Sequence, residues 1–371
     1  MNRVKEYVEK YAKEYAPLIV SGVLILALLL VALLPKGCGA GAKDPEMQAK
    51  TYYEYFDTQS TVFSYVGDDP ALFEARCAAI EHQLSYYHEL FDIYYEYSGV
   101  TNLRTLNRMA GKGPVVVDRA LIDFLLYAKD VYALTGGRVN VALGSVLSLW
   151  HDCREDADDG VFAIPSEEAL HEASLHTDLS AVVIDEAAST VEITDPALRL
   201  DVGALGKGYA AEQILSSLRD EGVTGYVLNL GGNLCTLGTK PSGDGWMTGI
   251  TNPDRTAADR FACRITLSDL SCVTSGDYER YYVVDGVRYH HIIDPATLYP
   301  AAYFASVSIL CRDSALADTL STALFCMSEE EGRSLIATLD GVEVLWIYAD
   351  GRQSMTDGFS ALLVKDKKAK G

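Results

Sequence analysis

One uncharged stretch near the N-terminus limits what this chain can fold into more than any other feature. Residues 18–34 run for seventeen positions without a charged side chain, between Pro17 and Pro35. This is the short end of the roughly 17–25 apolar residues that span a bilayer. The sixteen-residue polar lead before it is long for a cleaved signal peptide. We therefore interpret residues 17–34 as a transmembrane signal anchor; a buried core helix is the alternative.

The charges beside this stretch specify its orientation only weakly. Four basic residues precede it and two follow it. Because most of the chain lies on the C-terminal side, we expect residues 1–16 to be a short cytoplasmic segment and residues 35–50 a linker. The body would then lie outside the cytoplasm, held at the cell membrane by a single span. Cys38 offers a lipoprotein alternative, although Pro35 and Lys36 fit badly before a lipidated cysteine.

The rest of the chain is acidic. Residues 1–16 hold four Lys/Arg and three Glu, a sum of +1, so the remainder carries −22 of the total of −21. Such a body is repelled by phosphate backbones, which argues against a nucleic-acid partner. The seven cysteines after Cys38 contain no C-x-x-C pair, which argues against a structural zinc site and favours free thiols.

The body shows predicted strands and helices intermixed, without the regular alternation of a doubly wound sheet. This pattern favours an α+β fold for residues 51–365, followed by a solvated tail at residues 366–371. Residues 70–97 have the pattern of a helix, and so does the segment that ends at Gly136 and Gly137. His82 and His88 lie on the first helix, and we interpret both as surface or packing residues.

A glycine-rich turn, "LDVGALGKGYA", precedes a predicted helix. Asp201 closes an apolar strand there, and glycines surround Lys207. Free N–H groups at a helix N-terminus, together with a lysine, can bind an anion. The glycine spacing is wrong for a Walker A loop. An ordinary strand-to-helix turn is the alternative interpretation.

Two further segments carry groups that can do chemistry. In "SALADTLSTALFCM", Asp318 and Thr322 stand one turn apart on one helix face, where their oxygens suit Mg²⁺. An exposed aspartate and a threonine bonded into its own helix is the alternative. In "YHHIIDPATLYP", strand alternation puts His290 and His291 on opposite faces, so at most one can serve a given site. Structural histidines remain the alternative here.

The order of these segments resembles the ApbE-type FAD:protein FMN transferases. The motifs that carry the resemblance are D-V-G-A-L-G-K-G-Y-A, N-L-G-G-N, T-S-G-D-Y-x-R, H-I-I-D-P-A-T-x-x-P and A-D-T-L-S-T-A-L-F. Upstream, "YSGVTNLRTLNR" and "TGGRVNVALGSVLSLW" are similar to further family segments. The similarity covers roughly residues 51–364, and the motifs are jointly specific.

The resemblance implies an ApbE-like (T-fold-like) α+β fold that holds FAD, with Mg²⁺ at the pyrophosphate. It implies that Asp318, Thr322 and the backbone carbonyl of Ala204 are the metal ligands. The residues that it implies for FAD binding are Phe56, Tyr94, Arg138, Val139, Asn140, Asp201, Lys207 and Ile292.

The reaction implied by the resemblance moves FMN from FAD to a threonine hydroxyl of an acceptor protein and releases AMP. Acceptors of this family are typically extracytoplasmic parts of membrane-bound redox proteins. His291 aligns with the family's histidine before Ile-x-Asp-Pro, and a near-neutral pKa would suit it to the role of base. His290 is then a bystander. FAD hydrolysis to FMN and AMP, or FAD binding without catalysis, are the alternative functions.

Three positions depart from the family pattern. Asn140 and Asn233 stand where acidic residues are usual, and both keep the ability to form hydrogen bonds. Leu298 stands where the family has glycine. Because a positive φ is costly for a branched side chain, we expect a different turn at Leu298.

Overall fold

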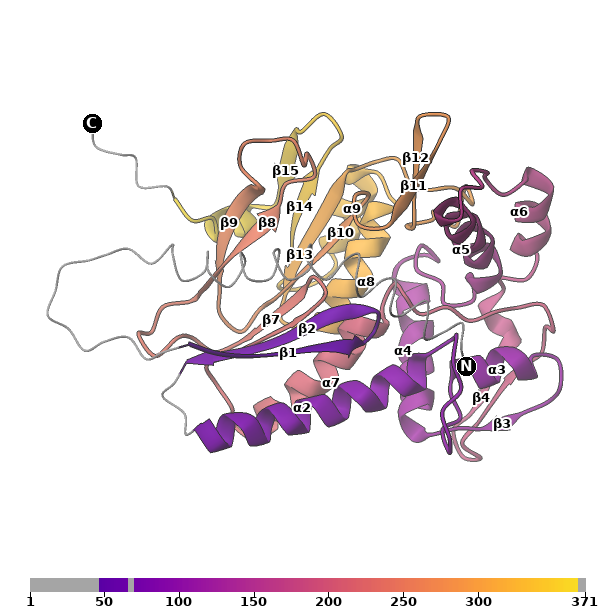
Figure 1. Cartoon of the computed structure of the whole chain (residues 1–371), viewed down its shortest axis with the longest axis horizontal. Coiled ribbons are helices and arrows are strands. Elements are labelled where there is room, and N and C mark those ends of the chain that lie inside the picture. The colour runs from indigo at the N-terminus through magenta and orange to yellow at the C-terminus, as the bar shows by residue number, and fades with distance from the viewer. Residues whose placement is uncertain (1–46, 66–69, 366–371) are drawn as a thin grey trace, which may run out of the picture. The chain divides into compact units, whose positions relative to one another are not determined.

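The computed structural model describes residues 47–65 and 70–365, which belong to one compact unit, Pro45–Gly371. Its largest element is an eight-stranded antiparallel sheet (Figure 1). The strands, in spatial order, are β1 (Met47–Tyr55), β2 (Thr58–Tyr65), β6 (Tyr226–Leu230), β7 (Asn233–Leu237), β10 (Ser271–Gly276), β13 (Ser306–Cys311), β14 (Glu343–Ile347) and β15 (Gln353–Met355).

The central strands of this sheet are buried on both faces. Every residue of β13 is buried, and its side chains alternate between two hydrophobic clusters, since Ile309 belongs to one and Leu310 to the other. Val273 and Cys272 on β10 alternate in the same way. The sheet is therefore the middle layer of the molecule, and both of its faces must be covered.

Helices cover one face of the sheet. They are α2 (Pro70–Phe91), α7 (Gly206–Asp220), α8 (Ser314–Phe325) and α9 (Glu329–Ile336). Helix α8 starts where the Asp313 side chain accepts a hydrogen bond from the backbone N–H of Leu316 at 3.0 Å. It packs on β10 and β13 and lies beside α7, so the first turn of α7 faces the middle of α8.

The opposite face is covered by a hairpin of β8 (Trp246–Thr251) and β9 (Phe261–Leu267) and by α10 (Asp357–Ala361). The remaining elements lie beyond one end of the sheet, on the right in Figure 1. They are α3 (Leu103–Met109), β3 (Val115–Val116), α4 (Arg119–Leu134), α5 (Gly144–Asp158), α6 (Glu167–Ser174), a 3₁₀ turn (Leu179–Ala181), β4 (Val182–Asp185), β5 (Thr190–Ile193), β11 (Tyr281–Val284) and β12 (Val287–His290).

The expected α+β class is confirmed by this arrangement of antiparallel sheet and helices. None of the helices within residues 47–65 and 70–365 is both long enough and apolar enough to cross a membrane. The signal anchor predicted at residues 17–34 and the tail at residues 366–371 lie outside the described residues.

Candidate active site

The first turn of α7 touches the middle of α8, and Gly208 makes this contact possible. A Cβ atom at Gly208 would lie 2.3 Å from Cβ of Asp318 and 2.5 Å from the backbone oxygen of Ser314. The backbone N–H of Gly208 donates to Oδ2 of Asp318 at 2.7 Å. The glycine-rich motif and the aspartate predicted to bind metal are therefore in direct contact, although they are separated by about a hundred residues of sequence.

Asp318 is a buried carboxylate in a polar environment. Burial raises its pKa, while the charge of Lys207, the N–H of Gly208 and the side chain of Asn233 act in the opposite direction. Asn233 begins β7, and its Nδ2 is buried without a well-formed hydrogen bond within the described residues. This unsatisfied donor points to a ligand that supplies an oxygen atom.

The oxygen atoms around Asp318 fit a hard cation. Oδ2 of Asp318 bonds to Gly208, which leaves Oδ1, and the Thr322 hydroxyl one turn further on bonds to none of the described residues. Nowhere in the described part of the chain do three His, Cys, Asp or Glu side chains come together as metal ligands. A cation bound here would take few protein ligands and complete its shell with water and phosphate oxygens, as Mg²⁺ prefers. Ala204, the predicted third ligand, precedes α7 and offers only its carbonyl.

The two histidines of the "YHHIID" segment have different environments. His290 is buried, and both of its ring nitrogens are used: Nδ1 accepts from the backbone N–H of Ile292 at 3.2 Å and Nε2 lies 2.8 Å from the carbonyl of Ala301. This pattern assigns the proton to Nε2 and leaves His290 no role beyond holding the loop.

His291 follows β12 and is only half-buried. Its backbone N–H donates to the carbonyl of Arg280 at 3.0 Å, and its Nδ1 lies 3.2 Å from the same oxygen. Because a carbonyl only accepts, Nδ1 carries the proton. Nε2 is therefore an unprotonated nitrogen, and among the described residues it has no hydrogen-bond partner.

The pKa of His291 is far from neutral, contrary to our expectation. Desolvation lowers it to about 3, and the positive charges of Arg280 and Lys207 act in the same direction. The imidazole is thus neutral throughout the physiological range. A histidine in this state is ready to accept a proton, although it holds one less strongly than a histidine of ordinary pKa.

Two cations that form no ion pair within the described residues lie near His291. Lys207 is half-buried and Arg280 exposed, and neither forms an ion pair within the described residues. Lys207 acts electrostatically on Asp201, Asp318 and His291, so it lies among these three predicted site residues. In a chain of net charge −21, unpaired cations at one place indicate an anionic ligand.

Asp201 and Tyr94 belong to the same region. Asp201 accepts from the N–H of Gly203 at 2.9 Å, and burial raises its pKa. Tyr94 lies on the loop after α2 with its ring partly exposed, and burial together with the charge of Asp201 raises its pKa to about 12. The structure thus brings Tyr94, Asp201, Lys207 and His291 together.

Phe56 lies at the tight turn between β1 and β2, where it and Asp57 both have positive φ. The N–H of Phe56 donates to Nδ1 of His88 at 3.2 Å, and the two rings meet edge to face at 5.6 Å. Nε2 of His88 lies 3.2 Å from the hydroxyl of Tyr97. His88, expected only to pack or to face solvent, therefore holds the turn that presents Phe56.

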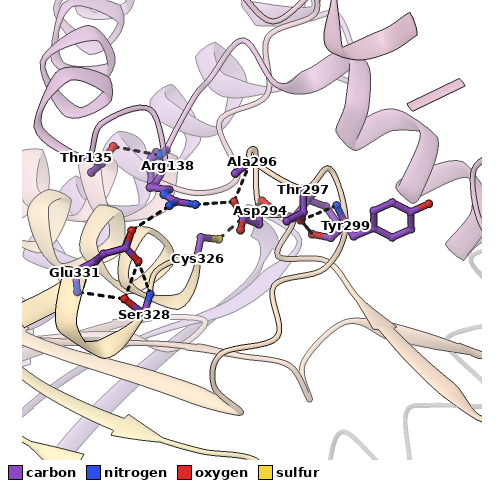
Figure 2. A network of polar contacts seen from close by, with 11 residues as sticks. Thr135, Arg138, Asp294, Ala296, Thr297, Tyr299, Cys326, Ser328 and Glu331 are labelled. Carbon is purple, nitrogen blue, oxygen red and sulfur yellow. Dashed lines mark hydrogen bonds and ion pairs between the residues drawn. The ribbon is translucent and has the colours of Figure 1, made fainter. Parts of the chain in front are cut away.

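In the segment Arg138 to Asn140, the polar side chains form hydrogen bonds with other residues of the chain. Figure 2 shows Arg138 between two carboxylates: Nη1 lies 3.0 Å from Oδ1 of the buried Asp294, and Nη2 lies 3.5 Å from Oε1 of Glu331. Arg138 thus ties the "HIIDP" loop to the start of α9. Its predicted contact with the flavin stays a prediction.

The other predicted flavin contacts nearby are similarly enclosed. Val139 and Ile292 are buried in the main hydrophobic cluster. Asn140 donates from Nδ2 to the carbonyl of Thr177 and accepts at Oδ1 from the N–H of Ala142, both at 2.9 Å. The main chain of Ile292 is also bonded, since its N–H donates to His290 and its carbonyl accepts from the N–H of Ala301.

The expectation of a different turn at Leu298 was wrong. Leu298 has φ of 64°, the left-handed conformation that glycine adopts without cost. Its N–H donates to the carbonyl of Asp294 at 2.8 Å, and its own carbonyl accepts from Nε1 of Trp150 at 2.9 Å. These bonds, with packing against the cluster around Trp150, hold the strained residue in place.

Arg280 is the clearest site residue that the sequence analysis missed. It is the arginine of the T-S-G-D-Y-x-R motif, to which we assigned no role. Its position just before β11 and opposite His291 follows from the pairing of β11 with β12, which extends to this residue. The motif itself was the signal that could have pointed to it.

The chain is similar to known proteins of one family over most of its length. The chain matches the ApbE family over residues 56–346. The FAD:protein FMN transferase of Treponema pallidum (strain Nichols) is 38% identical over 271 residues, covering 69% of this chain and 73% of that protein. The FAD:protein FMN transferase of Klebsiella pneumoniae (strain 342) is 30% identical over 281 residues, covering 74% and 82%.

A solved structure shows the same fold. The crystal structure of the ApbE protein of Thermotoga maritima MSB8 superimposes with a TM-score of 0.74 at 27% identity, covering 86% of this chain and 100% of that one. Family match, relatives and fold agree, and the chain therefore belongs to the ApbE family.

Proposed function

We propose that this chain is a Mg²⁺-dependent FAD:protein FMN transferase, which moves FMN from FAD to a threonine hydroxyl of an extracytoplasmic acceptor protein and releases AMP. The observation that carries the proposal is the protonation pattern of His291. Its Nε2 is unprotonated and unpartnered within the described residues, and it lies near the cations Lys207 and Arg280, neither of which forms an ion pair with the described residues. A base next to a set of anion-binding groups is what transfer of a phosphoryl group to a hydroxyl requires.

In the proposed transfer step, one P–O bond forms, one P–O bond breaks and one proton moves to His291. The threonine oxygen forms a bond to the FMN phosphorus, and its proton moves to Nε2 of His291. The bond from that phosphorus to the oxygen of the AMP phosphate breaks, and AMP leaves with the electron pair. Lys207 and Arg280 neutralise phosphate charge, while the carbonyl of Arg280 keeps the proton on Nδ1 and so leaves Nε2 free.

Mg²⁺ would be held by Asp318, Thr322 and the carbonyl of Ala204. When bound, it would neutralise the pyrophosphate oxygens and stabilise the leaving AMP. This assignment is supported by the buried carboxylate of Asp318, of which one oxygen is not bonded to Gly208, and by the Thr322 hydroxyl, which bonds to none of the described residues. The unsatisfied Nδ2 of Asn233 beside Asp318 would donate to an oxygen of the bound FAD.

We propose that seven residues contact the flavin nucleotide. Two of them are aromatic, Phe56 and Tyr94, and the others are Arg138, Val139, Asn140, Asp201 and Ile292. Tyr94 is partly exposed, and Phe56 is held by His88 at the tip of its hairpin. Each ring packs on a histidine, Phe56 on His88 and Tyr94 on His151, whereas Val139 and Ile292 are buried in the main hydrophobic cluster.

The uncharged segment at residues 17–34 supports a membrane location, with the transferase domain outside the cytoplasm. In this arrangement the domain would meet the extracytoplasmic part of a membrane-bound redox protein. Mass spectrometry of the mature N-terminus tests the proposal. An intact segment supports the anchor, and a start at a lipidated Cys38 would replace it with a lipoprotein.

Transfer is tested by expressing the chain together with the extracytoplasmic domain of a membrane-bound redox protein from the same organism. Fluorescence of the denatured acceptor in a gel shows covalently bound flavin, and chromatography measures AMP. We expect both products in equal amounts, with Mg²⁺ required. AMP release without labelled acceptor would indicate FAD hydrolysis, and FAD binding without AMP would indicate a binding protein.

A further inference from the structure

Two arginines from different elements have no carboxylate partner in the part of the chain that the structure describes. Arg154 lies on α5 and is half-buried, and Arg280 lies just before β11 and is exposed. Helix α5 carries acidic residues on both sides of Arg154, yet none of the described ion pairs includes it. Arginine is usually paired when it is partly buried, so the position of Arg154 needs an explanation.

Arg154 is held in place by a chain of side chains on its own helix. Its Nη2 donates to Nδ1 of His151 at 2.6 Å, and Nε2 of His151 lies 3.1 Å from Oε1 of Glu155. The ring of Tyr94 packs on His151 with 5.5 Å between centroids. The guanidinium of Arg154 is therefore directed by its neighbours and is not a freely moving surface group.

Arg280 is fixed through its backbone. Its carbonyl accepts from the N–H of His291 and faces Nδ1 of the same residue, at 3.0 and 3.2 Å. Helix α5 and the β11–β12 hairpin pack together through Trp150 and Tyr282, and this contact brings the two arginines near each other. Figure 1 shows α5 beside this hairpin.

The two positively charged guanidinium groups repel each other. Desolvation lowers the pKa of Arg154, and the charge of Arg280 lowers it further. Both charges also act on Tyr94, which places them around the same region as Asp201. Two like charges, one of them partly desolvated, raise the free energy of the empty site, and an anion between them would lower it.

We infer that Arg154 and Arg280 form a phosphate-binding subsite beside His291, which holds the FMN phosphate of FAD, the group attacked in the reaction. The inference rests on the proposed function. The carbonyl of Arg280 accepts from Nδ1 of the base, and the charge of the Arg280 guanidinium acts on the same imidazole, so this guanidinium lies near the base. Planar guanidinium groups bind two phosphate oxygens at once, which both orients the phosphate and neutralises its charge.

The subsite predicts a difference between two flavins. FMN keeps the phosphate in question, and riboflavin lacks it, so the full-length protein should bind FMN more tightly. The affinities are measured by quenching of flavin fluorescence, without Mg²⁺ and without an acceptor, so that neither metal binding nor turnover affects them. In Arg154→Gln and in Arg280→Gln, we expect FMN affinity to fall about tenfold or more, because each loses a charge-assisted hydrogen bond.

Arg288→Gln is the matched control. Arg288 lies on the same hairpin, but it pairs with Asp277 at 3.5 Å and lies 4.4 Å from the ring centre of Tyr281. Removing its charge should leave FMN affinity unchanged. Riboflavin affinity should stay constant in all three variants, which shows that they are folded. The double variant should lose less than the product of the single losses, since both arginines hold one group.

An unchanged ratio of FMN to riboflavin affinity in Arg154→Gln and Arg280→Gln would overturn the subsite. An equal loss in Arg288→Gln would do the same, because the effect would then be one of general charge. If the wild-type protein binds FAD and releases AMP, either of these results in the variants contradicts the subsite alone. A wild-type protein that binds no flavin contradicts the proposed function.

Discussion

The environment of each residue, more than its type, separates the side chains proposed to do chemistry from those that hold the fold. His290 and His291 are identical and adjacent, and strand alternation predicted that they face different ways. Hydrogen bonds to Ile292 and Ala301 use both nitrogens of His290, whereas only Nδ1 of His291 is used. The sequence contained the alternation but not the desolvation and nearby positive charge that lower the pKa of His291.

His291 should remain neutral well below the pH at which histidine usually titrates. Its folded pKa of about 3 lies under the roughly 6.5 expected in the unfolded chain. Between these values the unfolded state binds more protons, so this residue lowers stability as the pH falls from about 6.5 toward 3. NMR of nitrogen-labelled histidines in the flavin-free protein measures this directly. Titration of His291 near pH 6.5 would contradict the desolvated, positively charged environment described around it.

At the level of elements, the contact between α7 and α8 builds the site. The strand expected to end at Asp201 is absent: β5 ends at Ile193, and only an isolated bridge at Arg199 precedes α7. The glycine-rich turn brings Lys207 into the first turn of α7, and Gly208 lets α8 come close enough for Asp318 to meet it. Spacing alone predicted an i, i+4 pair on α8 and a turn before α7. Their meeting depends on packing between segments distant in sequence, which no local pattern shows.

Gly208→Ala should damage the fold and the site together. The added Cβ would overlap Cβ of Asp318 and the backbone oxygen of Ser314, so the two helices would have to separate. We expect the free energy of unfolding, measured in urea, to fall by about 1–3 kcal/mol or more. Gly206→Ala is the control, because its Cβ would lie 3.2 Å from a methyl group of Val202. Equal stability of the two variants would refute the close contact.

Asp318→Asn should stabilise the metal-free protein while it removes the response to Mg²⁺. Burial raises the folded pKa of Asp318, so its charged form costs stability above that pKa, and an uncharged amide avoids this cost. The amide oxygen still accepts from Gly208. Thermal unfolding at pH 7 with and without Mg²⁺ measures both effects.

The control for this experiment is Asp313→Asn, at the N-cap of the same helix. It should keep the stabilisation by Mg²⁺, because Asp313 lies outside the proposed metal site. If Mg²⁺ stabilises Asp318→Asn as much as the wild type, the metal assignment is wrong.

For the whole molecule, the sequence predicted the class of fold and several local features. The helix before Gly136 and Gly137 ends as expected, and both glycines have positive φ. The helix expected at residues 70–97 ends at Phe91, because the Asp92 side chain accepts from the N–H groups of Tyr94 and Tyr95 and turns the chain. A competing side-chain turn of this kind is hard to weigh against helix propensity from sequence alone.

Long-range partners were beyond sequence reasoning. Arg138 pairs with Asp294, 156 residues away, and Leu298 keeps a glycine-like conformation because Trp150 and Asp294 bond to it. The acidic total charge likewise did not reveal that Arg154, Lys207 and Arg280 lie unpaired in one region of the described chain. Each of these features depends on which surfaces the packed elements bring together.

The role of His291 is tested most sharply by FMN transfer to the acceptor protein, followed by intact mass and AMP release, in wild type, His291→Ala and His290→Ala. Loss of the base should lower the transfer rate by at least about 100-fold in His291→Ala, which still binds FAD. His290→Ala loses two buried hydrogen bonds and some stability, but its folded fraction should transfer FMN at close to the wild-type rate. Wild-type transfer by His291→Ala, or an equal loss per folded molecule in both variants, would contradict the assignment of His291 as the base.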